Sequence, residues 1–478
     1  IQAQQGNVAL NSTINETSQS IASSSTDAIK YKNRQSGFVQ QEIAQTELKA
    51  GQNVDINASK NIILEANKVE AGKNIIVGNT LMERQSDGQL KAKDGSTMPE
   101  NVTLNTLETQ NKQWDEQQEG YRGIAKELIK SVAIGATGLG LNKKISVGSS
   151  SSERTEKTLQ QGNTLTAENI AIGSANNTTI TSGNLTADNV HLSGKKVTLD
   201  AAKETEKQSI AKGEETVQGL GVKLNNDNIR LGGFVTEDTE QTTTTTKTTH
   251  KSGEINAKNI TIEGTEGVDL RGQNIKATGD TVIDHGRGEL NIGGYENTTT
   301  IEEKTKTEKV STEVGVRNAY LDAANALIAV KDAIKALSQA KDAYNKAEKD
   351  YAAGRITKQA LNDSKANIAM ATTNLATAQI AAGAAAAGAA AAGSTSFGTG
   401  FTIGANGERI KTESTTKSLE TQWQGSNLEL NNLTFKSEGQ NANIQGSNLR
   451  ATGTTTFDGT KDLNITAGTE RTQQESKT

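Results

Sequence analysis

Aliphatic and polar residues alternate in short stretches along most of the chain, and the same phrase returns every 20 or 21 positions. Residues 165–172 read Leu-Thr-Ala-Glu-Asn-Ile-Ala-Ile, residues 185–192 read Leu-Thr-Ala-Asp-Asn-Val-His-Leu, and a related phrase starts at Ile255. The five residues Gln-Gly-Ser-Asn-Leu occur at 424–428 and again at 445–449. Alternation of this kind predicts short strands with one buried face, separated by turns.

A repeat of this length is typical of one coil of a parallel β-helix. A single coil cannot bury its aliphatic face, whereas stacked coils bury it against each other and pair their backbones about 4.8 Å apart. We therefore expect Leu165 and Leu185 to lie on neighbouring coils. Asn169 and Asn189 would then occupy equivalent corners, either as a hydrogen-bonded amide ladder or as ordinary turn residues. Leucine-rich and helical repeats share this period, but the units lack a 3.6-residue apolar pattern and their Thr and Val favour strands.

Coil-like segments occur in groups, and the stretches between them interrupt the period. Two of these stretches begin and end in Thr, Glu and Lys-rich runs: one leaves near Glu204 and returns near Glu240, and the other leaves near Glu296 and returns near Thr412. Such arms predict exposed two-sided β-hairpins, with flexible linkers as the alternative. The coil groups lie near residues 5–11, 48–80, 162–200, 253–294 and 424–470.

The largest interruption contains the strongest helical pattern. From about residue 318 to 353 apolar residues recur every seven positions, and a second series follows a break at residues 354–357, which predicts two helices packed as an antiparallel hairpin. Such a hairpin is either a recognition tip or a spacer. The first series is Val330, Leu337, Tyr344 and Tyr351, with Leu327 and Ile334 at adjacent positions, and the second is Leu361, Ile368 and Leu375.

Two stretches are rich in small, uncharged residues. One covers the Gly/Ala run at 380–393 and continues to residue 403, and the other covers residues 124–141. Small-residue spacing suits close helix packing in a membrane, but alanine is only weakly apolar and each run is short of the roughly 20 residues needed to span one. We therefore expect continued packing or loop, with transient membrane contact as the alternative.

Composition supports an elongated structure. The chain has 478 residues, of which only 33% are hydrophobic and 3% aromatic, so ordinary compact cores are difficult to build. Pro99 is the only proline, which argues against disorder and favours uninterrupted strands. There is no cysteine, and the net charge of −5 is dispersed, which gives no basic stripe for nucleic acid. The polar ends of the chain suggest a section of a longer polypeptide.

Residues for enzyme chemistry are sparse. His191, His250 and His285 lie in different segments without metal-ligand spacing, and no phosphate-binding glycine motif is present. The serious enzymatic alternative is a polysaccharide lyase or hydrolase, which would use clustered carboxylates on a β-helix face. The candidate carboxylates share no local motif, so we expect no catalytic, cofactor-binding or metal site and no enzyme activity. They are Asp188, Asp200, Asp269 and Asp284.

The units at 165–173 and 185–194, followed by Lys-Val-Thr-Leu-Asp-Ala-Ala-Lys-Glu-Thr from Lys196, resemble the haemagglutinin repeats of two-partner secretion exoproteins. Coils with polar arms and a Gly-rich apolar segment particularly resemble the second, carboxy-proximal repeat region of contact-dependent growth inhibition effectors. The resemblance covers most of the chain apart from residues 318–393. The sequence lacks the amino-terminal secretion domain, the Val-Glu-Asn-Asn pretoxin boundary and the toxin domain of a full exoprotein.

The resemblance implies an all-β fold: a right-handed parallel β-helix with β-hairpin excursions and one inserted α-helical hairpin. We expect β-helix coils with β-rich excursions at 1–317, the helical hairpin and Gly/Ala-rich segment at 318–393, and a returning arm with further coils at 394–478. The implied function is a structural stalk or delivery region that helps transfer a C-terminal toxin across the outer membrane of a neighbouring cell. An adhesin or haemagglutinin stalk is the alternative.

The resemblance also implies a partner and a location. The expected partner is a cognate outer-membrane two-partner secretion transporter, with a target-cell outer membrane or surface receptor as a further candidate and no nucleic acid. The expected location is secreted or at the bacterial cell surface, with a stage in the periplasm before delivery.

Overall fold

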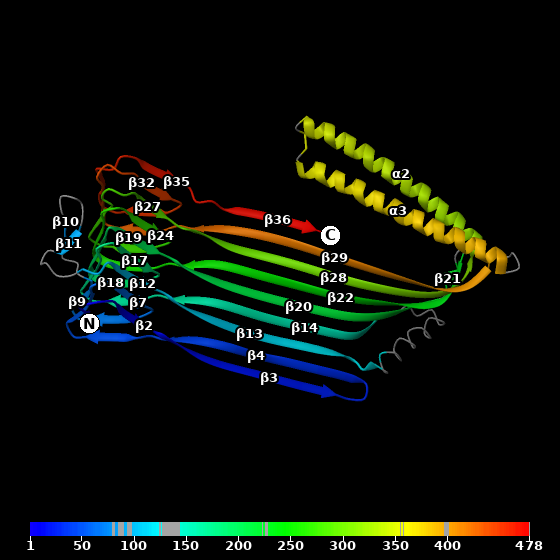
Figure 1. The fold of residues 1–478 in the computed structure, drawn as a ribbon, viewed down its shortest axis with the longest axis horizontal. Helices are drawn as coiled ribbons and strands as arrows, with labels where there is room; N and C mark the ends of the chain where they lie inside the picture. Colours follow the sequence, from blue (N-terminus) through cyan, green and yellow to red (C-terminus); the bar gives the residue numbers. More distant parts are fainter. Residues whose placement is uncertain are drawn as a thin grey trace.

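A computed structural model of the chain describes residues 1–478 apart from 79–81, 85–89, 93–97, 124–125, 127–143, 222, 225–227, 354, 357, 396–400 and 478. It has two β-rich bodies, which Figure 1 shows side by side. One is a stack of short parallel strands, here called the column. The other is a sheet of long antiparallel strands, here called the blade, which carries a helical hairpin at its far end.

The column is a parallel β-helix whose coils have three strands each, one on each of three faces. Strands of the first face are β5 (Glu47–Ala50), β8 (Lys68–Ala71), β15 (Thr164–Thr166), the first parts of β18 (Asn184–Gly194) and β23 (Glu254–Gly264), β25 (Asn274–Ala277), β30 (Asn427–Leu430) and β33 (Asn448–Ala451). The second face contains β1 (Gln2–Ala3), β6 (Asn53–Ala58), β9 (Asn74–Val77), β16 (Asn169–Gly173), the second parts of β18 and β23, β26 (Asp280–Asp284), β31 (Asn432–Lys436) and β34 (Thr455–Asp458).

The third face is a continuous sheet of nine parallel strands. These are β2 (Val8–Asn11), β7 (Asn61–Glu65), β12 (Asn101–Asn105), β17 (Asn177–Thr181), β19 (Lys196–Asp200), β24 (Val268–Arg271), β27 (Leu290–Gly293), β32 (Ala442–Gln445) and β35 (Leu463–Thr466). A small hairpin of β10 (Met82–Arg84) and β11 (Leu90–Ala92) leaves between β9 and β12.

Aliphatic side chains fill the interior of the column, as the alternating pattern predicts. Leu165 pairs directly with Leu185, which pairs with Ile255 in the next coil. All three are at most 2% exposed. The core cluster runs without interruption from Val8 to Ile444. The predicted β-helix is therefore confirmed.

The amide ladders are also present. Asn74 donates to Asn53 over 2.9 Å, Asn169 to Asn74 over 3.0 Å, Asn189 to Asn169 over 2.8 Å and Asn259 to Asn189 over 2.9 Å. Each bond joins one coil to the next on the outside of the column. The predicted amide ladder is therefore present, and these asparagines link neighbouring coils through their side chains.

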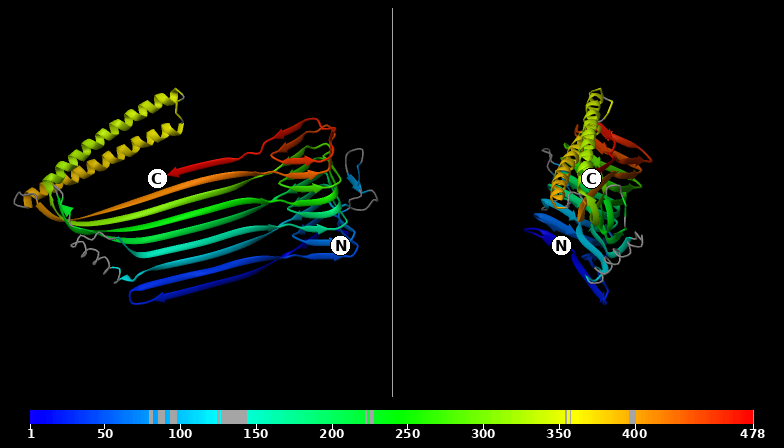
Figure 2. Two further views of the ribbon diagram at one scale, coloured as in Figure 1. Left: turned by 180° about the vertical axis from the view of Figure 1, so that it is seen from behind. Right: turned by 90° about the vertical axis from the view of Figure 1, so that its right-hand side faces the viewer.

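The blade is an antiparallel sheet built from successive excursions out of the column (Figure 2). Both predicted pairs of Thr-rich arms form β-hairpins, β20 with β22 and β28 with β29. Earlier excursions form hairpins as well, and all of them join edge to edge. The strands are β3 (Thr13–Thr26), β4 (Lys30–Ala44), β13 (Leu107–Tyr121), β14 (Lys144–Gln161), β20 (Ala202–Leu220), β21 (Lys223–Leu224), β22 (Asn228–Lys251), β28 (Tyr295–Asn318), β29 (Phe401–Gln424) and β36 (Arg471–Lys477).

Excursions leave from the same corner of every second coil, between the third and first faces. In the intervening coils a single residue in the left-handed region closes this corner, namely Ala66, Ser182, Gly272 or Gly446. The alternation has a geometric reason. Each excursion adds two strands to the blade, and two strand spacings of about 4.8 Å equal the rise of two coils, so blade and column grow at the same rate.

The helical hairpin consists of α2 (Ala319–Ala352) and α3 (Lys358–Thr395), which connect β28 to β29. Figure 1 shows that it starts at the end of the blade farthest from the column and folds back. The Gly/Ala run at 380–393 continues α3. The fold class is therefore an all-β parallel β-helix with β-hairpin excursions and an inserted helical hairpin, as predicted.

Candidate interaction surfaces

The junction between column and blade contains a cluster of interacting polar side chains. The Tyr295 hydroxyl, on the first residue of β28, donates a hydrogen bond to Asp200 at the end of β19. The His250 ring stacks on the Tyr295 ring with their centroids 4.3 Å apart. Burial and the neighbouring Asp200 carboxylate raise the pKa of Tyr295 to about 12, whereas Arg271 opposes that shift. The cluster fixes the direction in which β28 leaves the column.

The four carboxylates considered for polysaccharide chemistry have separate structural roles. Asp200 accepts from Tyr295, and Asp284 accepts from the backbone N–H of Gly286 over 2.9 Å. Asp188 is exposed on β18. Asp269 is 6% exposed. Asp200 and Asp269 lie on adjacent strands of the third face and both act on Arg271, while the other two lie elsewhere.

Asp269 is the most enclosed of the four. Its Oδ2 lies 2.8 Å from Lys196 Nζ, and its Oδ1 accepts from Asn291 over 2.9 Å. Burial alone would raise the pKa of Asp269, but the bonds from Lys196 and Asn291 outweigh it, so the pKa lies below its ordinary value. A carboxylate held in this way is an ionised structural group. It is not positioned as a general acid, which needs a raised pKa.

The three histidines are also held apart. His191 Nε2 lies 3.2 Å from the Glu263 carboxylate on the outside of the column, and His250 belongs to the junction cluster. His285 is fully buried, with its Nδ1 2.8 Å from the Gly288 carbonyl oxygen. Within the part of the chain that the structure describes, no three His, Asp or Glu side chains converge as a metal ion would require.

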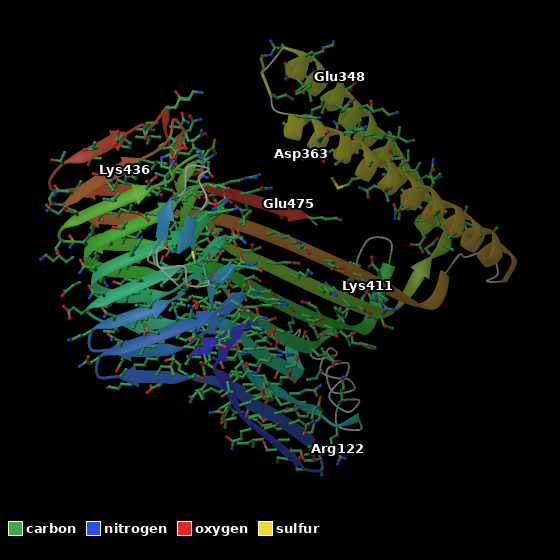
Figure 3. All side chains as sticks on the ribbon, turned by 60° about the vertical axis from the view of Figure 1, so that its left-hand side comes forward. Arg122, Glu348, Asp363, Lys411, Lys436 and Glu475 are labelled. Carbon is green, nitrogen blue, oxygen red and sulfur yellow. The ribbon has the colours of Figure 1, made fainter. Side chains whose placement is uncertain are left out.

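The two faces of the blade are covered with charged and hydroxyl side chains, which Figure 3 shows as sticks. Arg34 on β4 makes a bidentate pair with Asp115 on β13, with Nε and Nη2 at 3.0 and 2.6 Å from the two carboxylate oxygens. This bond lowers the pKa of Asp115 and raises the pKa of Arg34. Glu308 similarly pairs with Lys411 over 3.2 Å and with Arg409, and its pKa is lowered. The Arg34–Asp115 pair joins two successive hairpins, and the pairs of Glu308 join the two arms β28 and β29.

One row of the blade brings like charges together. Glu215, Asp238 and Glu308 are direct partners on β20, β22 and β28. Burial, followed by repulsion from Glu215, Glu308 and Glu240, raises the pKa of Asp238 above its ordinary value. Like charges directly opposite each other destabilise a sheet. Lys126 offsets part of this repulsion through an ion pair with Glu215 at 2.5 Å.

The helical hairpin differs from the sequence prediction at three side chains. Val330, Leu337 and Tyr344 of the predicted seam are partly buried, but its fourth residue, Tyr351, is 41% exposed. Leu327 and Ile334, predicted beside this seam, are 66% and 52% exposed. Alanines occupy the positions that complete the seam, so the helices approach closely and leave these larger side chains outside. Ala347 is the most buried of them, at 9% exposed.

Exposed apolar side chains lie on the half of α2 that joins the blade. Tyr320, Leu327 and Ile334 are spaced by seven residues and are all exposed, and Ile380 on α3 is 75% exposed. Within the described residues, neither α2 nor α3 combines the length and apolar character that crossing a membrane demands. The second apolar stretch, 124–141, falls outside the described residues apart from Lys126, as does much of 396–403.

Residues 144–308 match the model of the hemagglutinin repeat family. This range covers one complete excursion, from β20 to β22, together with the returning arm β14 of the excursion before it, the first part of β28 and the coils between these strands. The resemblance to a haemagglutinin-repeat region of a two-partner secretion exoprotein is thus confirmed. No curated protein and no solved structure matches the chain.

The family match defines a class of protein. Haemagglutinin-repeat proteins are secreted or cell-surface substrates of two-partner secretion, which implies a transporter partner. The family is of a structural and adhesin type and is not an enzyme family. Residues 144–308 of this chain are therefore similar to a repeat of filamentous haemagglutinin-like secreted exoproteins.

Proposed function

We propose that this chain is a rigid delivery section of a secreted bacterial exoprotein, exported through a cognate outer-membrane transporter and retained in the periplasm until contact with a neighbouring cell. Its role is to help carry a C-terminal toxin across the outer membrane of that cell. Residues 1–317 and 394–478 act as the scaffold, and residues 318–393 act as the element that meets the target. No catalytic step is part of this proposal.

The distribution of charge along the helical hairpin is the observation that supports delivery most directly. No charged residue occurs between Lys365 and Glu408, and Asp322 is the single charge in the first twelve residues of α2. The end of the hairpin next to the blade therefore has Asp322 as its single charged side chain and has exposed apolar side chains, while the opposite end has many charges. An element of this kind suits contact with the apolar edge of a lipid headgroup layer better than contact with water.

Flotation with outer-membrane vesicles and with liposomes of phosphatidylethanolamine and phosphatidylglycerol tests this proposal. The full chain is expected to float with vesicles, and a double variant Leu327→Lys and Ile334→Lys is expected to remain in the dense fraction. Asn345→Lys and Asn362→Lys together form the control, because they add the same charge at exposed positions of the opposite, charged end of the hairpin. A wild-type chain that does not float, or a control that loses flotation equally, contradicts the proposal.

Adhesion is the second candidate function, and the position of the hairpin at the far end of the blade favours it. A helical element held away from a polar scaffold is well placed to meet a surface ligand on a host or bacterial cell. Deleting residues 318–379 is then expected to abolish cell binding while secretion continues. If the deleted chain still binds cells, the hairpin is not the adhesive element.

A further inference from the structure

A run of four serines lies in the middle of the blade, at residues 149–152 of β14. Successive strand residues point to opposite faces, so Ser150 and Ser152 lie on one face and Ser149 and Ser151 on the other. These small side chains lie beside larger ones of β13 and leave a depression on each face. The structure has hollows of about 600 Å³ beside Ser150 and Ser152 and about 650 Å³ beside Ser149 and Ser151.

The first of these, here called the serine hollow, has a floor of small side chains. Ser150, Ser152 and Ala211 line it, and Gly213 is the direct partner of Ser150 on β20. Its lining residues come from strands β3, β4, β13, β14, β20 and β22. Most of these strands form the half of the blade that begins with β3 in Figure 1. Its shape is an open trough, which suits an extended ligand better than a compact one.

The walls of the serine hollow are polar and mostly uncharged. Four carboxamides, on Asn33, Gln35, Gln117 and Gln118, line it from β4 and β13. Each carboxamide offers both hydrogen-bond donors and an acceptor. Two carboxylates, on Glu116 and Glu240, stand at its sides, and Arg34, which is paired with Asp115, also lines it. The carboxamides and carboxylates accept hydrogen bonds from hydroxyl groups, and the two carboxylates are not neutralised by Arg34, whose charge Asp115 already balances.

An aromatic ring lies next to each end of the hollow. Trp114 precedes Glu116 by two residues on β13, and Tyr31 is the direct partner of Gly120. Both rings lie over glycines: a Cβ atom on Gly37 would stand 2.5 Å from the Trp114 ring, and one on Gly120 would stand 3.1 Å from the Tyr31 ring. Because these glycines have no side chain, the rings lie along the sheet on the face that bears Ser150. Six residues of strand separate the two positions, about 20 Å.

We propose that the serine hollow binds a linear, uncharged oligosaccharide. A sugar ring has an apolar C–H face, which packs on an aromatic ring, and a rim of hydroxyls, which pairs with carboxamides and carboxylates. A trough with aromatic ends and carboxamide walls matches this chemistry along its length. The hollow on the opposite face is different, because charged side chains surround it, namely Lys32, Glu119, Lys212, Glu214 and Glu237.

The site binds without cleaving. Glu240 lies in the same cross-strand row as Gln118, two residues from Glu116, and three strand spacings separate β13 from β22. The backbones at these two residues are thus about 16 Å apart. Glycoside hydrolysis needs a carboxyl pair about 5 to 9.5 Å apart. Sugar binding on the blade is independent of membrane contact by the helical hairpin, so either proposal can fail without the other.

The protein has two tryptophans, which makes a direct binding assay possible. Trp423 lies at the column, where its indole N–H donates to the Gly446 carbonyl over 3.0 Å, so Trp423→Phe leaves Trp114 as the single reporter. Trp114 emission is followed on titration with chitohexaose, cellohexaose and mannohexaose, and calorimetry on the unmutated chain measures the same affinities. At least one neutral hexasaccharide is expected to bind saturably, and a heparin hexasaccharide is expected to bind more weakly.

Two arginine substitutions on the same strand locate the site. Ser152→Arg fills the serine hollow, and Ser151→Arg places the same side chain on the opposite face. Ser152→Arg is expected to weaken binding roughly tenfold or more, and Ser151→Arg less than about twofold. Tyr31→Ala, which keeps the serine run, is expected to weaken binding by about three- to tenfold.

Circular dichroism establishes that each variant is folded before its affinity is compared. The proposal is overturned if no neutral hexasaccharide binds the folded chain, if the heparin hexasaccharide binds more tightly than the neutral ones, or if Ser151→Arg and Ser152→Arg weaken binding equally.

Discussion

The column and the blade are both β-sheet structures, but they are held together by different forces. In the column the stacked coils bury inward aliphatics, and side chains such as Leu192 and Phe435 are completely enclosed, whereas Leu463 and Ile465 of the last coil are exposed. In the blade both faces meet water. A small separate cluster of buried residues, Val147 and Val217, lies on β14 and β20, near the end of the blade away from the column. The column is thus stabilised by burial, and the blade by backbone pairing and cross-strand contacts.

This difference has a structural consequence. A two-sided polar sheet of single hairpins would be marginal in water, since isolated hairpins have little stability. Here each hairpin begins and ends at the column, and the coils place neighbouring hairpins at the distance at which their edge strands can pair. The spacing of the column therefore sets the spacing of the blade strands. The blade can therefore present long polar surfaces without a core of its own.

Truncating an aliphatic side chain in each body tests this comparison with the largest expected effect. Leu192→Ala in the column is expected to lower the free energy of unfolding by about 2–5 kcal/mol, because it leaves a cavity in a fully enclosed site. Ile210→Ala, in the middle of the blade and half-buried, is expected to cost less than about 1 kcal/mol. Urea denaturation followed by circular dichroism measures both. Equal losses would show that the blade has a core of its own.

The junction supplies the next largest effect. Tyr295→Phe removes the bond to Asp200 and is expected to cost about 1 kcal/mol at neutral pH. The pKa of Tyr295 is raised from 10.0 to about 12, so the protonated hydroxyl is favoured in the folded state. Its contribution is complete below pH 10 and is lost as the pH rises from 10 to 12.

The difference in stability between the unmutated chain and Tyr295→Phe should therefore shrink over that interval. Comparing the two proteins cancels the titration of other tyrosines and lysines. A difference that stays constant from pH 9 to pH 12 would contradict the role given to this hydroxyl.

How much of this arrangement the sequence could predict depends on which force is at work. Leu165 and Leu185 predict how the coils stack, because burial requires apolar and polar residues to alternate strictly along each strand. The register between strands of neighbouring coils follows from that alternation. The seven-residue spacing of Val330 and Leu337 predicts the helical hairpin for the same reason. Each of these predictions depends on a hydrophobic pattern.

The blade has no such pattern. The composition of the Thr-rich arms predicts two of its hairpins, but not that the hairpins join into one sheet. Pairing of Trp114 with Gly37 joins two hairpins that are far apart in the sequence, and polar residues on both faces give no indication of their register. Ala66 and Ser182 close tight corners in the left-handed conformation, which glycine usually adopts. Because neither residue is glycine, the sequence does not show that tight corners and excursions alternate. The serine hollow follows from this register and was not visible in the sequence.

The asparagine ladder offers a smaller test, on the outside of the column. Asn189 donates to Asn169 and accepts from Asn259, so Asn189→Ala breaks two links between coils. The expected cost is about 1 kcal/mol, since the freed amides regain part of their bonding from water. Lys258→Ala, an exposed neighbour in the next coil, is the control and is expected to change stability by less than about 0.5 kcal/mol. Denaturation midpoints of the two variants should differ accordingly.

The smallest expected effect separates two carboxylates within the blade. The pKa of Asp238 is raised by burial and by the carboxylates of Glu215 and Glu308, so its ionised form opposes folding at neutral pH. This unfavourable contribution disappears as the pH falls through the folded pKa. Asp238→Asn is expected to raise the Tm slightly at pH 7, equivalent to a few tenths of a kcal/mol, and to have no effect once the pH is below the ordinary Asp value of about 3.8.

Asp115→Asn is the matched comparison, because the sign of its effect is opposite. Arg34 lowers the pKa of Asp115, so the ionised form favours folding, and this contribution is present above the ordinary Asp pKa and lost as the pH falls through the folded pKa. Asp115→Asn is therefore expected to lower the Tm at pH 7, where Asp238→Asn raises it. If both substitutions shift the Tm in the same direction at pH 7, cross-strand charge does not determine the stability of the blade, and its coherence comes from backbone pairing and from the column alone.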